Sequence, residues 1–151
     1  MQSLLNIDEY FVDELQVKTN PNYKKQKKEE KGEISTAISI KRKGKEPFFM
    51  IQMKIELNKA QKAFSSAPYY LLLEISGFFS FMSEINEETI NKMIGLNGPV
   101  ILYGVARGVV AQATANCRHG KFILPTVNLL EAMKKDAEQK KRKTNNNLKK
   151  R

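Results

Sequence analysis

The sequence is poor in residues that form disulfides, metal sites and many active sites: it has one cysteine, one histidine and no tryptophan among 151 residues. A single cysteine, Cys117, cannot form an internal disulfide, which fits a reducing compartment. One cysteine and one histidine are too few for a tetrahedral zinc set, so we expect no metal site. Cys117 and His119 lie on one chain segment and do not by themselves form a nucleophile with its base. We therefore expect a protein that is not an enzyme.

Long hydrophobic runs are also missing. The most apolar stretch, YYLLLEISGFFSF at 69–81, is shorter than the roughly 20 apolar residues that a transmembrane helix needs, and it contains Glu74. The N-terminal residues show no basic leader, no apolar segment and no small-residue cleavage site. We therefore expect a cytoplasmic protein without membrane insertion.

Acidic residues are scarce at the C-terminal end of the chain. Residues 134–151 hold nine basic and two acidic residues, which is +7 of the formal net charge of +10. The sequence therefore predicts one domain over residues 1–135, followed by a basic, disordered tail over 136–151. Binding of this tail to the phosphates of nucleic acid is the alternative function. The tail has no interleaved aromatic residues and no recognition-helix pattern, which argues against sequence-specific readout.

Apolar residues recur with a period of two in the first half of the chain. In 69–81 every second residue is apolar or glycine. The same alternation over 47–57, over 33–43 and, more weakly, over 10–18 predicts four strands. Gly44 suits a hairpin turn between the second and third strands. The polar connections favour an antiparallel sheet.

The second half changes to a helical period. Asn86 is a candidate cap for a short helix over 86–94, which Gly95 should end. A longer helix is predicted over 99–120, and a last helix from about Asn128. The expected fold is therefore α+β, a four-stranded antiparallel sheet with two main helices packed on one face.

Small residues line the longer predicted helix. Gly104, Gly108 and Ala111 would let another surface approach closely, and that surface is either the protein's own sheet or a helix of another subunit. Arg107 lies on the same apolar helix, where a charge needs a partner. It either meets a carboxylate across a subunit interface or reaches solvent along the helix. These four residues are the predicted subunit interface.

Two stretches of the sequence resemble one family. LEISGFFSF at 73–81 ends the fourth predicted strand. The stretch 101–133 combines a long helix, which has an Ala-Arg pair at 106–107, with a glycine-containing turn and the loop pattern Leu-Pro-x-Val-Asn at 124–128. In these stretches, and in its order of four strands then two main helices, the chain resembles the SecB family of protein-export chaperones over roughly residues 8–135.

The resemblance implies a homotetramer, built as a dimer of dimers. It would hold unfolded polypeptides in apolar grooves as a holdase, without ATP, a cofactor or covalent chemistry. The implied clients are preproteins for export or, as for some SecB-like proteins, an antitoxin. In the family an acidic sheet surface docks on the SecA motor, whereas here Glu46, Glu56 and Glu74 are scattered among lysines, which weakens such docking. Delivery to SecA and service of an antitoxin therefore both remain open.

The family's grooves lie between the sheet, the crossover loop and the last helix. Carried over to this chain, the resemblance nominates these client-binding residues: Phe122, Leu124, Val127, Leu130 and Met133, with Phe78 and Tyr70 from the opposite sheet face. Each has the alternative role of a buried packing residue. On the groove interpretation, we expect Phe122→Asp or Leu124→Asp to weaken client capture without unfolding the oligomer.

Overall fold

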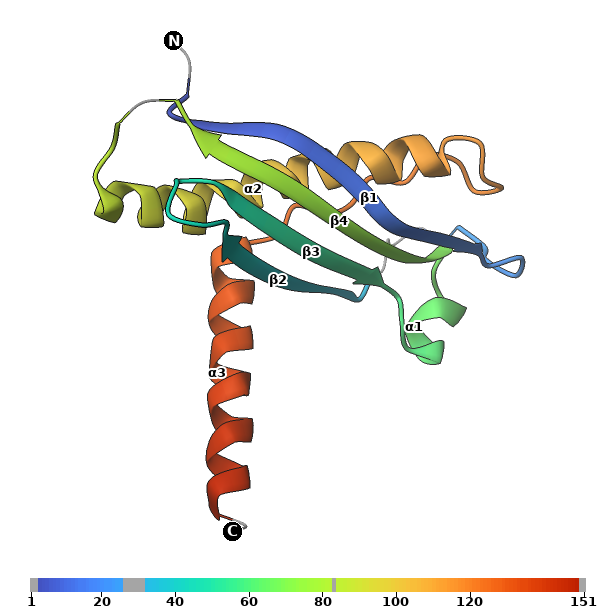
Figure 1. The fold of residues 1–151 in the computed structure, drawn as a ribbon. Helices are drawn as coiled ribbons and strands as arrows, with labels where there is room; N and C mark the ends of the chain where they lie inside the picture. Colours follow the sequence, from blue (N-terminus) through green and yellow to red (C-terminus); the bar gives the residue numbers. More distant parts are fainter. Residues whose placement is uncertain (1–2, 26–31, 83, 150–151) are drawn as a thin grey trace.

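A computed structural model describes residues 3–25, 32–82 and 84–149. Four antiparallel strands form one sheet: β1 (Leu5–Thr19), β2 (Ile34–Arg42), β3 (Phe49–Leu57) and β4 (Tyr69–Phe81). Their order across the sheet is β1-β4-β3-β2, so β1 and β2 are its two edges (Figure 1). The predicted four-stranded antiparallel sheet is confirmed.

Three helices complete the fold: α1 (Gln61–Ser65), α2 (Glu87–Thr114) and α3 (Leu129–Lys149). Helix α2 packs across one face of the sheet, which we call the core face, and α3 begins beside β2 and points away from the sheet (Figure 1). We call the opposite side of the sheet the outer face. The two main helices were predicted from the sequence, whereas the short α1 was not.

The division of α2 into two helices was wrong. Gly95 and Pro99 lie inside one continuous helix, which ends at Thr114 rather than near Gly120. A proline inside a helix clashes with the carbonyl four residues earlier, and here that carbonyl belongs to Gly95, which has no side chain to obstruct an adjustment. Gly98 also lies so close to β3 that an added Cβ would be 2.5 Å from Ile51 Cδ1. Packing of this part of α2 against β3 therefore outweighs the local preference of Pro99 to start a helix.

The core lies between α2 and the apolar face of the sheet. Alternate residues of β3 and β4 point toward the helix, as the period of two predicted. The buried apolar residues form one cluster: Leu5, Phe49, Ile51, Met53, Ile55, Leu57, Leu71, Leu73, Ile75, Phe79, Ile90, Ile94, Leu102, Tyr103, Ala106, Val110, Leu124 and Leu129. In the part of the chain that the structure describes, α2 is the one helix long and apolar enough, by length and composition, to cross a membrane. Because this same helix supplies the core, its length and apolar composition are weak evidence for insertion into a membrane.

The last helix extends through most of the segment that we predicted to be a disordered tail. Helix α3 continues to Lys149, and residues 150–151 lie outside the described part. Two ion pairs at i, i+4 spacing support it, Glu131 with Lys135 and Asp136 with Lys140, each at 3.1 Å. The separation of a body from a basic tail stays a prediction.

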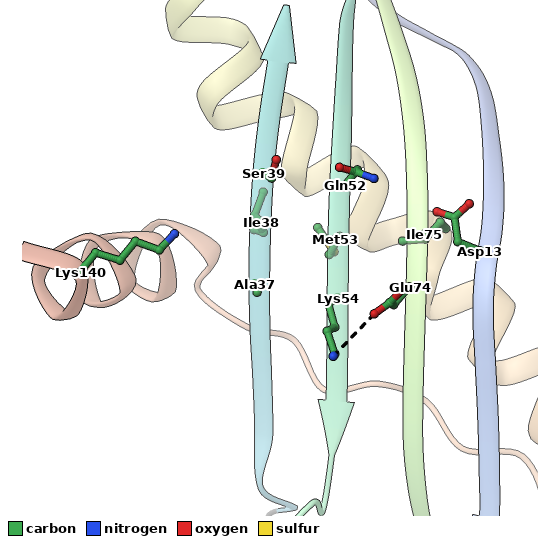
Figure 2. A pocket seen from close by; sticks show the side chains of 10 residues that line it. All are labelled: Asp13, Ala37, Ile38, Ser39, Gln52, Met53, Lys54, Glu74, Ile75 and Lys140. Atoms are coloured by element: carbon green, nitrogen blue, oxygen red, sulfur yellow. Dashed lines mark ion pairs between the residues drawn. The ribbon is translucent and has the colours of Figure 1, made fainter. Parts of the chain in front are cut away.

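The outer face of the sheet is mostly polar along the centre of β3 and β4. Figure 2 shows the four strands side by side, with Lys54 of β3 and Glu74 of β4 forming an ion pair at 3.6 Å. These two residues are opposite each other in the β3–β4 register. A cross-strand pair of opposite charge supports this pairing.

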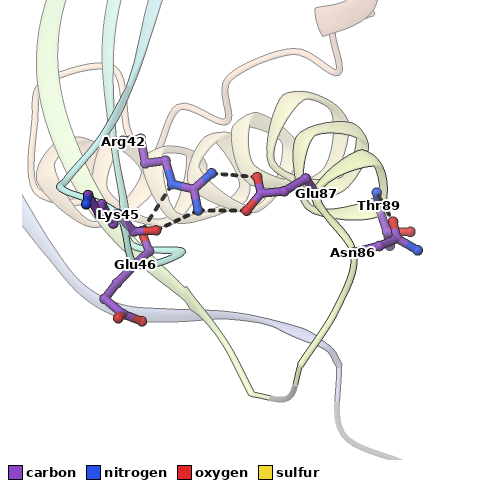
Figure 3. A network of polar contacts seen from close by, with 6 residues as sticks. All are labelled: Arg42, Lys45, Glu46, Asn86, Glu87 and Thr89. Carbon is purple, nitrogen blue, oxygen red and sulfur yellow. Dashed lines mark hydrogen bonds and ion pairs between the residues drawn. The ribbon is translucent and has the colours of Figure 1, made fainter.

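Arg42 joins the β2–β3 hairpin to the first turn of α2 (Figure 3). Its two terminal nitrogens donate to the two carboxylate oxygens of Glu87, at 2.6 and 3.0 Å. The same guanidinium also donates to the carbonyls of Lys45 and Glu46 within the hairpin. Next to Glu87, Asn86 caps the helix by accepting a hydrogen bond from the Thr89 amide at 2.8 Å, as predicted.

This contact shifts the pKa of Glu87. The hydrogen bond from Arg42, and then its positive charge, lower the pKa of the Glu87 carboxyl below its ordinary value. Because the folded-state pKa is depressed, the pair's stabilising effect is present above the ordinary pKa and is lost as the pH falls through the folded-state pKa. We expect Arg42→Gln to return the pKa of Glu87 toward its ordinary value in a carboxyl-detected NMR titration. The same Glu87 titration in both proteins would contradict the contact.

Candidate functional site

A groove separates β2 from the first half of α3. Its α3 side consists of residues at i, i+1, i+4, i+5 and i+8 spacing, which lie on one helix face. The groove has a volume of about 190 Å³ and is lined by Thr36, Ile38, Ala132, Met133, Asp136, Ala137 and Lys140. Of the residues nominated from the sequence, Met133 is the one that lines it. Its flexible thioether side chain adapts to ligands of different shape.

The backbone of β2 offers unused hydrogen-bonding groups to this groove. The Lys43 amide donates to the Phe48 carbonyl and the Asn58 amide to the Glu33 carbonyl, both at 2.7 Å, at the two ends of the β2–β3 ladder. In an antiparallel pair such residues alternate with others whose N–H and C=O point away from the partner strand. The residues of β2 whose backbone N–H and C=O point away from β3 are therefore Ile34, Thr36, Ile38, Ile40 and Arg42. Within the described residues, no strand pairs with that side of β2.

A second hollow lies across the four strands on the outer face of the sheet and reaches the same edge (Figure 2). Its volume is about 320 Å³, and the small side chains of Ala37 and Ser39 leave room above the strands. Ile38 and Lys140 line both hollows. The open edge of β2 is thus flanked by space on both faces, which is what an added strand with alternating side chains needs.

The crossover segment between α2 and α3 is held firmly against α2. Thr114 Oγ1 accepts from the Phe122 amide at 2.8 Å, and Arg107 Nε donates to the Leu124 carbonyl at 3.0 Å. The Tyr103 hydroxyl donates to the Pro125 carbonyl at 2.6 Å, and burial raises the pKa of this hydroxyl. The contact of Arg107 is neither of the two that we expected from the sequence, a carboxylate across a subunit interface or solvent.

These contacts decide how exposed the nominated loop residues are. Leu124 is fully buried, and Phe122 and Val127 are half-buried against the core. The burial of Leu124 favours its alternative role as a packing residue of the loop. Leu130 is exposed near the start of α3 and lies outside the lining of the groove.

Phe78 and Tyr70 lie on the outer face, away from the crossover loop and α3. Tyr70 donates its hydroxyl to Glu56 at 3.1 Å, and burial, followed by the Glu56 contact, raises the pKa of this hydroxyl. Phe78 packs edge-to-face on Phe11. The nominated residues therefore do not form one site.

The predicted subunit interface lies on the side of α2 that faces away from the sheet. Gly104 and Gly108 are exposed, and an added Cβ at either would meet no atom within 4 Å apart from the neighbouring backbone of α2 itself. Ala111, one turn further on, is half-buried. Across residues 3–25, 32–82 and 84–149, no group of three histidine, cysteine, aspartate or glutamate side chains gathers to hold a metal ion.

The sequence of the chain matches a known family. The model of the family described as "Preprotein translocase subunit SecB" matches residues 1–140 of the chain. This chain belongs to the SecB family. The resemblance found in the sequence is therefore confirmed, and SecB-family membership supports a chaperone role.

Three proteins show how near this SecB-family chain is to known ones. The SecB-like chaperone Rv1957 of Mycobacterium tuberculosis, solved with a ChAD peptide from the Rv1956 HigA1 antitoxin, is 14% identical with a TM-score of 0.59, covering 82% of this chain and 91% of that one. That likeness confirms the fold. A Streptococcus agalactiae protein of unknown function is 9% identical, covers 81% of this chain and 97% of its own, and has a TM-score of 0.42. "Uncharacterized protein MJ0357" of Methanocaldococcus jannaschii is 33% identical over 87 residues, 56% of this chain and 54% of that protein, so the match spans about half of each.

Proposed function

We propose that this SecB-family chain is an ATP-independent holdase that binds unfolded polypeptides at the open edge of β2. The observation that carries this proposal is the row of outward-pointing backbone groups of β2, which lies between two hollows. An unfolded client would add to the sheet as a further strand beside Thr36 and Ile38. Its side chains would then point alternately into the groove beside α3 and into the hollow on the outer face.

This mode of binding explains how one site takes many sequences. Hydrogen bonds to the backbone of β2 do not depend on the client's side chains. Burial of an apolar client side chain against Ile38 and Met133 adds about 1.5–3 kcal/mol for a large side chain. Capture by burial and hydrogen bonding requires neither ATP nor a cofactor nor covalent chemistry. We therefore propose a binding protein rather than an enzyme.

We propose a homotetramer, a dimer of dimers, as the working assembly. Two surfaces support it. Strand β1 is a long open edge that a second copy's β1 can extend, because an unpaired strand edge favours pairing with another chain. Gly104 and Gly108 on α2 leave room for a helix of another copy, with Ala111 and Arg107 beside them. Neither surface uses the edge of β2.

The clients we propose are unfolded chains in the cytoplasm, either preproteins for export or an antitoxin. The Mycobacterium tuberculosis chaperone was solved with an antitoxin peptide, which favours an antitoxin as one client class. Delivery of clients to SecA remains the second option, because the family description names the preprotein translocase.

The test replaces one β2 residue whose backbone amide points away from β3. In Thr36→Pro the ladder to β3 keeps its hydrogen bonds, because the Thr36 amide points away from β3. The client strand loses its hydrogen bond from the amide of residue 36 and meets the proline ring. We therefore expect client affinity to fall by about tenfold or more. One measurement uses light scattering to monitor how far the chain suppresses aggregation of a reduced, unfolded model protein. A second measures direct binding of the same model protein.

Thr36→Ala is the matched control, because it shortens the same side chain but keeps the amide. We expect it to capture clients nearly as well as the wild type. Circular dichroism must show that both variants are folded. Full capture by a folded Thr36→Pro variant would show that clients do not add to β2.

A second candidate function rests on α3. Beyond Glu138 the described side chains of this helix include Lys140, Lys141, Arg142 and Lys143 and no acidic one, so this part of the helix has one sign of charge. Such a surface favours the phosphates of nucleic acid, with an affinity that falls steeply with salt. The same charges also stabilise the C-terminal end of the helix.

A further inference from the structure

The charge of α3 changes along its length. The first ten residues, 129–138, hold three acidic and two basic side chains, and two of the acidic ones are tied up in ion pairs, Glu131 with Lys135 and Asp136 with Lys140. Over 139–148 all the charged side chains are basic: Lys140, Lys141, Arg142 and Lys143. This second half of the helix points away from the sheet, so its charges lie in water rather than against the body (Figure 1).

Helical spacing places two of these lysines on the side of α3 that lines the groove. The five α3 residues of the groove lie on one helix face, and Lys140 is the last of them. Lys143 follows three residues after Lys140 and seven after Asp136, so it continues the same face. Thr144 and Asn147 extend this face further by the same spacing. We call Lys140, Lys143, Thr144 and Asn147 the basic face of α3.

The opposite side of the helix provides a natural comparison. Lys134, Glu138 and Arg142 follow one another at i, i+4 and i+8 spacing and form a row that points away from the groove. Lys134 and Arg142 are exposed, as are Lys140 and Lys143. The same helix therefore offers two pairs of exposed cations, one on the groove side and one on the far side.

The basic face is continuous with the proposed client edge of β2. Lys140 lines both hollows that flank this edge (Figure 2). The residues three and four positions before Lys143 are Lys140 and Gln139, so no carboxylate one turn earlier neutralises Lys143. The helix rises about 10 Å from Lys140 to Asn147, a distance that an extended chain covers with about three residues. A client that leaves the β2 edge can therefore lay a short stretch on the basic face.

The strand itself has the same sign of charge. Strand β2 contains Lys41 and Arg42 and no acidic residue, and exposed Lys43 follows directly. Arg42 is already occupied by Glu87, at 2.6 Å, whereas Lys41 and Lys43 are in none of the ion pairs of the described residues. The path of an added strand thus meets positive charge at the hairpin end of β2 as well as on α3.

We propose that the basic face of α3 is a second subsite for the client, which selects unfolded polypeptides that carry acidic residues next to an apolar stretch. This inference rests on the proposed function, because the edge of β2 holds the apolar stretch. Lys140 and Lys143 attract the client's carboxylates and raise the rate of association, while apolar burial and backbone hydrogen bonds keep the client bound.

A nucleic acid fits the basic face less well than an acidic polypeptide. The four basic side chains of 139–148 are divided between different sides of the helix, so they form no continuous strip for a phosphate backbone. Asp136 lies in the groove beside Lys140 and would repel phosphates there. An unfolded polypeptide can instead place apolar side chains in the groove and carboxylates beyond it.

The test uses three synthetic fluorescein-labelled peptides with one shared centre, Val-Phe-Thr-Leu-Thr-Val. Three glutamates, three glutamines or three lysines flank this centre at both ends. Binding to the full chain is measured by fluorescence anisotropy. We expect the wild type to bind the glutamate peptide about fivefold more tightly than the glutamine peptide at low salt, and the lysine peptide most weakly. In about 1 M salt, where the Debye length is about 3 Å, the three affinities should converge.

The decisive variant is Lys140→Gln, Lys143→Gln, which should bind the glutamate and glutamine peptides about equally. Its matched control, Lys134→Gln, Arg142→Gln, removes the same charge from the far side and should keep the wild-type preference. Glutamine has nearly the helix propensity of lysine and arginine, and circular dichroism checks that both variants keep α3. Equal affinity of the wild type for the glutamate and glutamine peptides at low salt, or the same loss of preference in both variants, would overturn the proposal.

Two further measurements separate this subsite from the β2 edge and from a nucleic-acid surface. The glutamine peptide reports on the edge alone, so unchanged binding of it by folded Thr36→Pro would contradict the edge, whereas the ratio of glutamate to glutamine peptide affinities reports on the basic face. Single-stranded oligothymidylate is the nucleic-acid probe. Tighter binding of this probe than of the glutamate peptide, lost equally in both α3 variants, would identify a nucleic-acid surface and overturn the proposal.

Discussion

We expect Leu124→Asp to destabilise the fold by about 3–5 kcal/mol, because it would place an uncompensated charge where no solvent reaches. Leu124 has an exposed fraction of 0% and belongs to the core cluster. Its own carbonyl accepts from Arg107 Nε at 3.0 Å, so the loop cannot move outward without breaking that hydrogen bond. A typical domain has a total stability of only about 5–15 kcal/mol, so this one substitution removes a large part of it.

The neighbouring residue provides the control. Ile123 is 47% exposed, and a carboxylate there remains in water. We expect Ile123→Asp to change the free energy of unfolding by less than about 0.5 kcal/mol, as surface substitutions usually do. Urea unfolding followed by circular dichroism measures both variants. Equal stability of the two would mean that the crossover segment is not packed as described, and would restore Leu124 as a groove residue.

The second large effect is expected at the contact between α2 and β4. Leu102 is fully buried, and Leu102→Ala should cost about 2–5 kcal/mol through lost burial and the cavity that remains. Gly77 lies directly opposite, and an added Cβ there would be 2.9 Å from Leu102 Cδ1 and 2.9 Å from Phe79 Cε2. Gly77→Ala should therefore cost about 1–3 kcal/mol through overpacking.

The two substitutions are expected to compensate in part. Removing the Leu102 side chain makes room for the new methyl group at Gly77, whereas its contact with Phe79 remains. The double variant should thus lose less stability than the sum of the single ones, by about 0.5–3 kcal/mol. Thermal or urea unfolding of all four proteins gives this coupling energy. Strict additivity would indicate that the two side chains do not touch.

Regular parts of the fold were predictable because one local rule governs each. Strand β4 was predicted with its bounds, because every second residue from Tyr69 to Phe81 is apolar or glycine. Strand β1 was predicted from Tyr10 but begins at Leu5, because register shifts at Ile7/Glu9 and Val12/Glu14 interrupt the alternation. Gly44, with φ of 74°, occupies the predicted hairpin turn.

The candidate site was less predictable, because it depends on which strand is an edge. Alternation identifies β2 as a strand but does not reveal that its second side has no partner, so Thr36 and Ile38 were missed. Met133 was found through the family resemblance and lines the groove. For a leucine in a loop, such as Leu124, the sequence does not distinguish a client contact from a packing contact. Only the tertiary structure separates the two.

The open edge of β2 has an evolutionary consequence. If clients are held by their backbone, then a mutation in a client changes a side chain but leaves the groups that β2 recognises intact. Client genes would then be free to diverge without matching changes in the chaperone gene, provided that some apolar residues remain near the strand. A chain of this kind would keep serving its clients after transfer to a new host, since the peptide backbone is the same in every proteome.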